Sequence, residues 1–145
     1  MSLNLTTLPT ERPQVSEGLH LCTIISTTLR KSNRTGNTVL NICFKCDEGT
    51  FFDSITESED PRAQYKLARL LTVLDVVKNF KNPEKVELSE IAEHIINRKL
   101  GVYVNMSREQ GGYESRPQVN INGDMFLTPA EYEEVSKIIQ EEGII

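Results

Sequence analysis

The stretch that decides the fold is residues 17–55, EGLHLCTIISTTLRKSNRTGNTVLNICFKCDEGTFFDSI. A β-rich run from Leu19 to Leu29 leads into a polar, basic loop at residues 30–37. A second run covers Thr38 to Cys46, and a third, Thr50 to Ile55, follows a short turn that contains Gly49. Three such runs joined by turn-forming residues predict a meander of three antiparallel strands.

The alternation within these runs indicates which side of each strand is buried. In the second run Leu40, Ile42, Phe44 and Cys46 share one face, which we expect to be the core face. In the third run Phe51, Asp53 and Ile55 share one face of the strand, and Phe52 lies on the other face. The first run is long for a strand, and this length predicts a curved strand that serves two sheets, as small barrels require.

Downstream the pattern becomes helical and later returns to strands. Asp60-Pro61 is typical of a helix start, and Thr128-Pro129 with Glu131 is typical of another that carries a capping box. The expected elements are, in order, a helix over 62–78, a shorter helix from 89 to 96, a strand over 98–106, a last strand ending near 121, and a terminal helix after Thr128.

This order predicts a mainly β fold with added helices, β-β-β-α-α-β-β-α. It is the order of the five-stranded barrel called the OB-fold, which binds oligonucleotides and oligosaccharides. An α+β sandwich with helices on one face of a sheet is the alternative. We expect an extended N-terminal arm at residues 1–14, an OB-fold-like domain at 15–127, and an acidic C-terminal helix or tail at 128–145.

The charge distribution bears on the class of partner. The net charge is −5, which argues against a protein that coats nucleic acid through bulk charge. However, residues 129–145 contain five Glu and one Lys, so the rest of the chain is close to neutral. There is no transmembrane run and no signal peptide, and the three cysteines fit a reducing compartment. We therefore expect a cytoplasmic protein that does not bind a membrane.

Cations and aromatic residues on the expected strands and loops are the candidates for nucleic-acid binding. The loop at 30–37 can present cations and hydroxyl groups to phosphates, and outward aromatic side chains can stack on bases. Tyr103 and Tyr113 are preferred over Phe52 for stacking, because both lie among polar residues. The opposing interpretations are a solvated hairpin turn and aromatic rings that pack under helices. The candidate residues are Arg30, Lys31, Arg34, Lys45, Phe52, Lys99, Tyr103, Arg108, Tyr113 and Arg116.

Two patterns could suggest metal chemistry. Cys43 and Cys46, with His20 and Cys22 on the neighbouring strand, have zinc-like spacing. Residues three apart on a strand face opposite sides, so Cys46 would point inward while the other three point outward, and buried structural cysteines are favoured. The carboxylates between Asp53 and Asp60 could hold Mg²⁺ in a nuclease, but acids are expected before a helix in any case. No catalytic motif is present, and we expect neither an enzyme nor a cofactor.

Two short motifs resemble a known family. The hairpin Lys31-Ser32 with Gly36-Asn37, and the strand start Arg98-Lys99-Leu100-Gly101-Val102, are similar to those of phage-encoded OB-fold single-stranded-DNA-binding proteins of replication and recombination modules. The resemblance covers roughly residues 15–122. It implies non-catalytic binding and protection of single-stranded DNA by a dimer or higher oligomer, in the cytoplasm of the host cell if the protein is phage-encoded. The chain departs from this family at its end, where Ile144-Ile145 closes an apparently helical segment in place of an aromatic tip.

These observations lead to one main functional hypothesis and one alternative. The first is a single-stranded-DNA-binding protein with a basic groove and aromatic stacking, in which the loop at 30–37 forms one wall of the groove and the loop at 107–117 forms the other. Its acidic C-terminal segment either recruits replication or recombination proteins or packs on the barrel. The alternative is a protein–protein adaptor or structural phage component with a β-barrel core and no affinity for nucleic acid.

Overall fold

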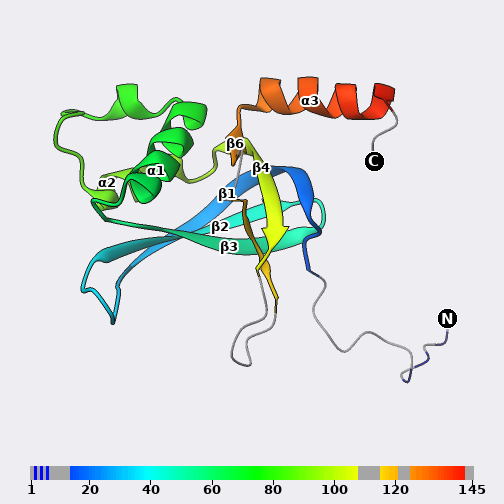
Figure 1. Cartoon of the computed structure of the whole chain (residues 1–145), viewed down its shortest axis with the longest axis horizontal. Coiled ribbons are helices and arrows are strands. Elements are labelled where there is room, and N and C mark those ends of the chain that lie inside the picture. Colours follow the sequence, from blue (N-terminus) through cyan, green and yellow to red (C-terminus); the bar gives the residue numbers. More distant parts are fainter. Residues whose placement is uncertain are drawn as a thin grey trace.

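The structure is a computed structural model that describes residues 2, 4, 6, 14–107, 115–120 and 125–142. One curved antiparallel sheet forms its centre, and the helices α1, α2 and α3 lie above it in the view of Figure 1. Helices α1 and α2 contribute buried residues to its core, whereas α3 packs on β4 at Gly101. None of the described helices is long and apolar enough to cross a membrane.

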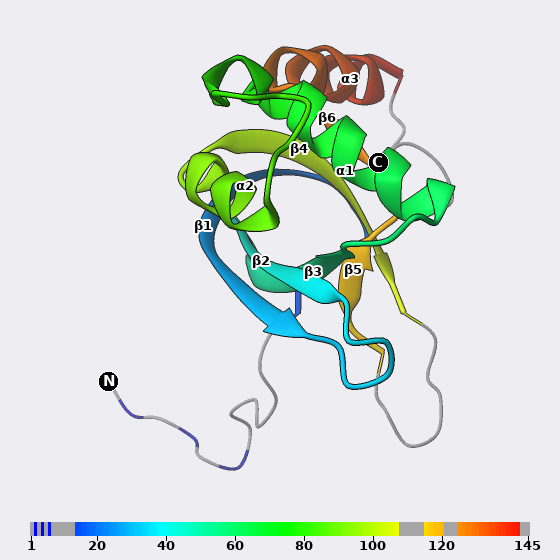
Figure 2. The ribbon, with the colours of Figure 1, turned by 90° about the vertical axis from the view of Figure 1, so that its left-hand side faces the viewer.

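The sheet is built around the long first strand. Five strands follow the order β3-β2-β1-β4-β5, and a sixth, β6, pairs with β4 at Gly101 and Val102. Every printed pairing is antiparallel, and the sheet curls until its edge strands β3 and β5 lie side by side (Figure 2). No strand pairing joins these edges in the described residues. The strands are β1 (Gly18–Lys31), β2 (Thr38–Cys46), β3 (Gly49–Thr56), β4 (Lys99–Met106), β5 (Pro117–Val119) and β6 (Phe126–Leu127).

A β-bulge lets β1 serve both halves of the sheet. The register of β1 against β2 shifts between Ile24 and Ser26. Cys22 and Ile24 point into the core before the bulge, whereas Ser26 pairs with Cys43, on the outer side. Bulges of this kind bend a strand and increase its twist, and this one accompanies the strong curvature predicted from the length of β1.

Two of the helices, α1 and α3, begin at the capping residues predicted from the sequence. In α1 (Pro61–Leu74) the Asp60 carboxylate accepts a hydrogen bond from the Arg62 N–H at 2.9 Å, and this bond holds the pKa of Asp60 below its usual value. Asp75 ends α1 in the left-handed conformation, and a short 3₁₀ helix, η1 (Val77–Asn79), follows. The remaining helices are α2 (Leu88–Ile95) and α3 (Pro129–Glu142).

The core lies between the concave face of the sheet and helices α1 and α2. Phe44 is its centre, stacked on Phe51 at 5.1 Å between ring centroids and on Phe126 at 6.5 Å. Leu70 and Ile95, from α1 and α2, are fully buried in the same cluster. Aromatic pairs at these distances add to the free energy of burial. The predicted core face of β2 is therefore confirmed.

The predicted mainly β architecture with added helices is confirmed, with two differences. The last part of the sheet consists of two short strands, β5 and β6, so there are six strands where five were expected. In the described residues β3 and β5 do not pair with each other, so the strand pairing does not show a closed five-stranded barrel. The expected N-terminal arm falls almost entirely outside the described residues.

Candidate nucleic-acid interface

A cleft of about 460 Å³ lies where the outer face of β3 meets β5. We call it the β3–β5 cleft. Residues of β1, β2, β3 and β5 contribute to it, so it depends on the curvature that brings the two edges of the sheet together. Its lining residues are Gln14, Arg30, Asn41, Thr50, Phe51, Phe52, Asp53, Ser54, Arg116, Pro117 and Gln118.

Three of the candidate residues predicted from sequence line this cleft together. Arg30 comes from the end of β1, Phe52 from β3, and Arg116 from the residue before β5. Phe52 is 64% exposed, so no helix covers its ring. In the described part of the chain neither guanidinium group forms an ion pair, and both are available to a ligand.

Asp53, which also lines the cleft, is fully engaged within the protein. Its Oδ1 accepts hydrogen bonds from Lys66 Nζ at 2.8 Å and from the Ser54 N–H, and its Oδ2 accepts from the Val119 N–H at 2.6 Å. The carboxylate thus links β3 to α1 and to β5. Because Lys66 neutralises its charge, Asp53 does not cancel the positive charge of the two arginines.

The other candidates lie outside this cleft. Lys31 and Arg34 are exposed at the β1–β2 hairpin. Lys45 and Lys99 are exposed and both pair with Thr23 of β1, so they flank it in one row on the outer face. Tyr103 is half-buried on β4. Arg108 and Tyr113 lie outside the described residues, as does most of the predicted second wall between Ser107 and Pro117.

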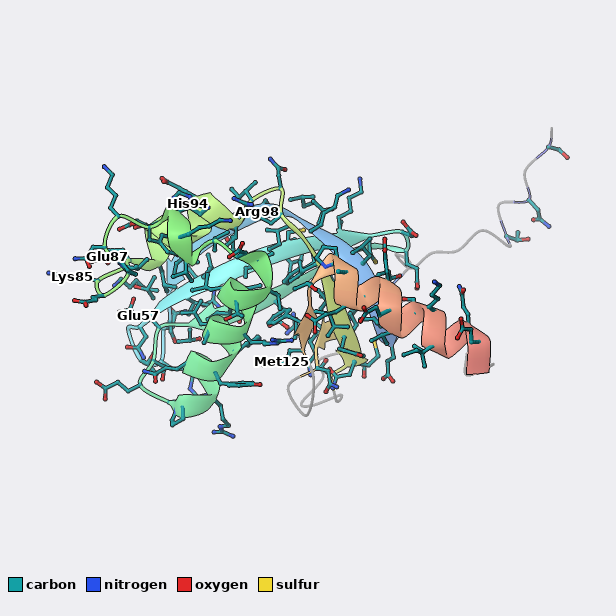
Figure 3. All side chains as sticks on the ribbon, turned by 90° about the horizontal axis from the view of Figure 1, so that it is seen from above. Glu57, Lys85, Glu87, His94, Arg98 and Met125 are labelled. Atoms are coloured by element: carbon teal, nitrogen blue, oxygen red, sulfur yellow. The ribbon has the colours of Figure 1, made fainter. Side chains whose placement is uncertain are left out.

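A second cleft, of about 320 Å³, lies between α1, α2 and the end of β3. Its apolar side chains include Leu67 and Val86, and its carboxylates are Glu57 and Glu87. Figure 3 shows these two residues on the same side of the molecule, at the end that carries α2. Two carboxylates would repel a phosphate backbone, so this cleft is not part of the candidate interface.

The cysteines and carboxylates singled out as metal candidates do not form a site. In the part of the chain that the structure describes, no three His, Cys, Asp or Glu side chains are grouped as metal ligands. Cys22 lies in the core with Cys46, so the prediction that it points outward was wrong: the bulge shifts the alternation of β1. Burial raises the pKa of the Cys22 thiol, which disfavours the thiolate that a metal would need.

Asn41 and Gln118 are cleft residues that the sequence reasoning missed. An amide between two apolar neighbours, as Asn41 is between Leu40 and Ile42, was the available signal.

Comparison with known proteins does not assign a function to this cleft. No protein-family model matches the chain, and no curated protein matches it.

Proposed function

We propose that this protein binds single-stranded DNA without catalysing a reaction, and that the β3–β5 cleft is the centre of its interface. The observation that carries the proposal is the convergence of Arg30, Phe52 and Arg116 in one cleft. These residues are far apart in the sequence, and two of them bring cations that no carboxylate in the described residues neutralises.

The chemistry of the cleft suits a nucleic acid strand. Guanidinium groups form bidentate hydrogen bonds with phosphates, and an exposed aromatic ring stacks on bases whatever the sequence. The volume, about 460 Å³, lies within the range of sites for small molecules, so it fits one or two nucleotides. Lys31 and Arg34 at the hairpin, and Lys45 and Lys99 on the outer face, would bind phosphates on either side of these nucleotides.

The strand order supports an OB-type barrel as the scaffold. In that fold the first strand is shared between the two halves of the barrel, and the third and fifth strands meet to close it. Here β3 and β5 lie side by side, and the Asp53 carboxylate joins them through the Val119 N–H. The proposed interface lies on the outer face of β2 and β3, where OB-folds bind oligonucleotides.

The deciding experiment is fluorescence anisotropy with a labelled oligo(dT) of about 16 nucleotides, the upper end of the site size of one OB domain. Binding should weaken steeply as salt increases, with a slope of about −0.7 for each phosphate contact. The double variant Arg30→Ala/Arg116→Ala should bind at least tenfold more weakly and show a shallower slope. Lys81→Ala/Lys85→Ala removes the same charge from exposed positions outside the cleft and is the matched control.

Two results would contradict the proposal. One is no detectable binding at low salt by the folded protein. The other is equal loss of affinity in the two double variants, because the effect would then reflect net charge and not the cleft.

A second candidate function, a protein–protein adaptor, is favoured by exposed apolar side chains. Leu21 and Ile25 on β1, and Ile138 on α3, are exposed although each is large and hydrophobic. Such residues can form an interface with a partner or with a second copy of the chain. Light scattering that finds a stable oligomer, together with no oligonucleotide binding, would support this candidate over the first.

A further inference from the structure

Two amide side chains face the β3–β5 cleft from opposite sides of β3. Asn41 lies on β2, where it pairs with Ser54 of β3. Gln118 lies on β5, at the other side of β3. Phe52 stands on the strand between them. A flat ring stacked on Phe52 would therefore have one amide at each of two edges.

Both amides have free hydrogen-bonding groups. Among the described residues, no hydrogen bond involves the side chain of Asn41 or that of Gln118, whereas Asn105, which pairs with Gln118, bonds to Asn120. Each amide offers a donor beside an acceptor. A single half-exposed amide is usually only hydrated. Two amides at one cleft, beside an exposed aromatic ring, can recognise a stacked base through hydrogen bonds to its edges.

The base that best matches two amides is adenine. Its Hoogsteen edge presents the N6 donor beside the N7 acceptor, and its Watson–Crick edge presents the N6 donor beside the N1 acceptor. The Hoogsteen-side edge of guanine has two acceptors, that of thymine has one acceptor and a methyl group, and that of cytosine has only a donor. Adenine is thus the one base with a donor beside an acceptor on both edges.

The other polar groups of the cleft are consistent with this match. A carboxylate could select cytosine through N4, but both oxygens of Asp53 are already engaged, by Lys66 and Ser54 on one side and by Val119 on the other. Arginine can select guanine. Arg30 and Arg116 also line the cleft, and in this arrangement they would bind the phosphates on either side of the base.

We propose that the cleft is selective for adenine: one adenine of a single strand stacks on Phe52 while Asn41 and Gln118 read its two edges. This inference rests on the proposed function, and it adds a sequence preference to a binding mode that stacking and phosphate contacts alone would leave unselective. Good bidentate contacts to a base contribute about 1–3 kcal/mol of discrimination in duplex DNA, so a preference of about tenfold is expected here.

The test is competition against a labelled oligo(dT) by unlabelled oligo(dT) strands that carry one central substitution. The strand with adenine should compete about tenfold better than the strands with thymine, guanine or cytosine. Replacing that adenine with 7-deazaadenine, which lacks the N7 acceptor, should remove most of the preference. Asn41→Leu and Gln118→Met, which preserve side-chain size, should each reduce the preference for adenine by a larger factor than they reduce affinity for plain oligo(dT). Gln140→Met on the exposed face of α3 is the matched control.

Each result separates this inference from the function on which it rests. Equal competition by all four strands overturns adenine selectivity and leaves single-stranded-DNA binding intact. A preference for guanine overturns it as well, because the arginines would then be reading the base. A preference for adenine that 7-deazaadenine retains overturns the reading of two edges. Failure to bind any strand refutes the proposed function itself. If a variant does not fold in a thermal unfolding control, the 7-deazaadenine comparison on the unaltered protein still decides.

Discussion

Lys66 Nζ lies 2.8 Å from Asp53 Oδ1, and each of the two side chains is only 14% exposed. Lys66 also donates to the Ser54 carbonyl at 3.0 Å, while the second Asp53 oxygen accepts from the Val119 N–H. One largely buried ion pair therefore connects α1, β3 and β5. β3 and β5 form opposite walls of the β3–β5 cleft and share no strand pairing in the described residues. The hydrogen bond from the Val119 N–H to Asp53 Oδ2 therefore links the two edges, and Lys66 holds that carboxylate in place.

Breaking this ion pair should destabilise the protein strongly. Lys66→Met leaves a carboxylate at a site with little access to water, and removing one partner of a buried pair typically costs about 3–5 kcal/mol. We expect a loss of about 3 kcal/mol in the free energy of unfolding, measured by urea denaturation. Asp53→Asn/Lys66→Met, which removes both charges, should recover part of that loss. Glu59→Ala, at an exposed position without a partner among the described residues, is the control. A loss no larger than that of the control would show that the pair does not hold the sheet edges.

Phe52 should contribute to DNA binding and little to stability. Its ring is 64% exposed, so Phe52→Leu removes little buried surface. Stacking contributes about 1–3 kcal/mol for each base, so affinity for oligo(dT) should fall about tenfold. Tyr65 on α1 is 63% exposed and lies outside the cleft, which makes Tyr65→Leu a matched control. Equal affinities of the two variants in the anisotropy assay would assign the stacking to another side chain.

The elements with strong local signals could be predicted from the sequence. The three meander strands follow from alternation, and both helix starts follow from capping residues whose hydrogen bonds the structure contains, Asp60 with Arg62 and Thr128 with Glu131. β6 could not be predicted in this way. It has only two residues, Phe126 and Leu127, which is too short for any alternation, and it exists because β4 offers a free edge there.

The loops that carry Arg30 and Arg116 were predicted to form two walls of one groove, but the sequence did not assign the cleft to the meeting of β3 and β5. Arg30, Phe52 and Arg116 were singled out from sequence, but their convergence depends on a bulge and on the meeting of two sheet edges, which are tertiary events. Asp53 illustrates the same limit. It was considered part of a metal-binding carboxylate cluster, and the structure instead pairs it with Lys66. The sequence alone does not reveal this partner, because Asp53 lies on β3 and Lys66 lies on α1, and only the packing of the helix on the sheet brings them together.

Gly101 provides the close approach between α3 and the sheet. A Cβ atom at this position would lie 3.2 Å from the Cβ atoms of Leu127 and Tyr132, and 3.4 Å from a ring carbon of Tyr132. Gly101→Ala should therefore displace the start of α3 and lower the free energy of unfolding by about 1–2 kcal/mol, the usual effect of overpacking. Urea denaturation would measure it. A gain in stability would mean that α3 shifts freely, and that its first turn is not fixed on β4.

The capping box of α3 should make stability depend on pH. The Thr128 N–H donates to Glu131 Oε1, and the Thr128 hydroxyl accepts from the Glu131 N–H, each at 3.1 Å. The first of these bonds holds the pKa of Glu131 below its usual value. The unfolded chain then binds a proton at a higher pH than the folded chain does, so the stabilisation is complete above the ordinary glutamate pKa of about 4.3 and is lost as the pH falls through the lower folded value. Glu131→Gln should be less stable than the unaltered protein at neutral pH, and urea denaturation at a series of pH values should show that difference disappearing in acid.

Thr128→Ala should lose about 1 kcal/mol of the free energy of unfolding at neutral pH. Glu134→Gln, on the exposed side of the same helix, should show no such convergence. A Glu131→Gln difference that stays constant down to strongly acidic pH would mean that the charge of Glu131 plays no part in holding the start of α3.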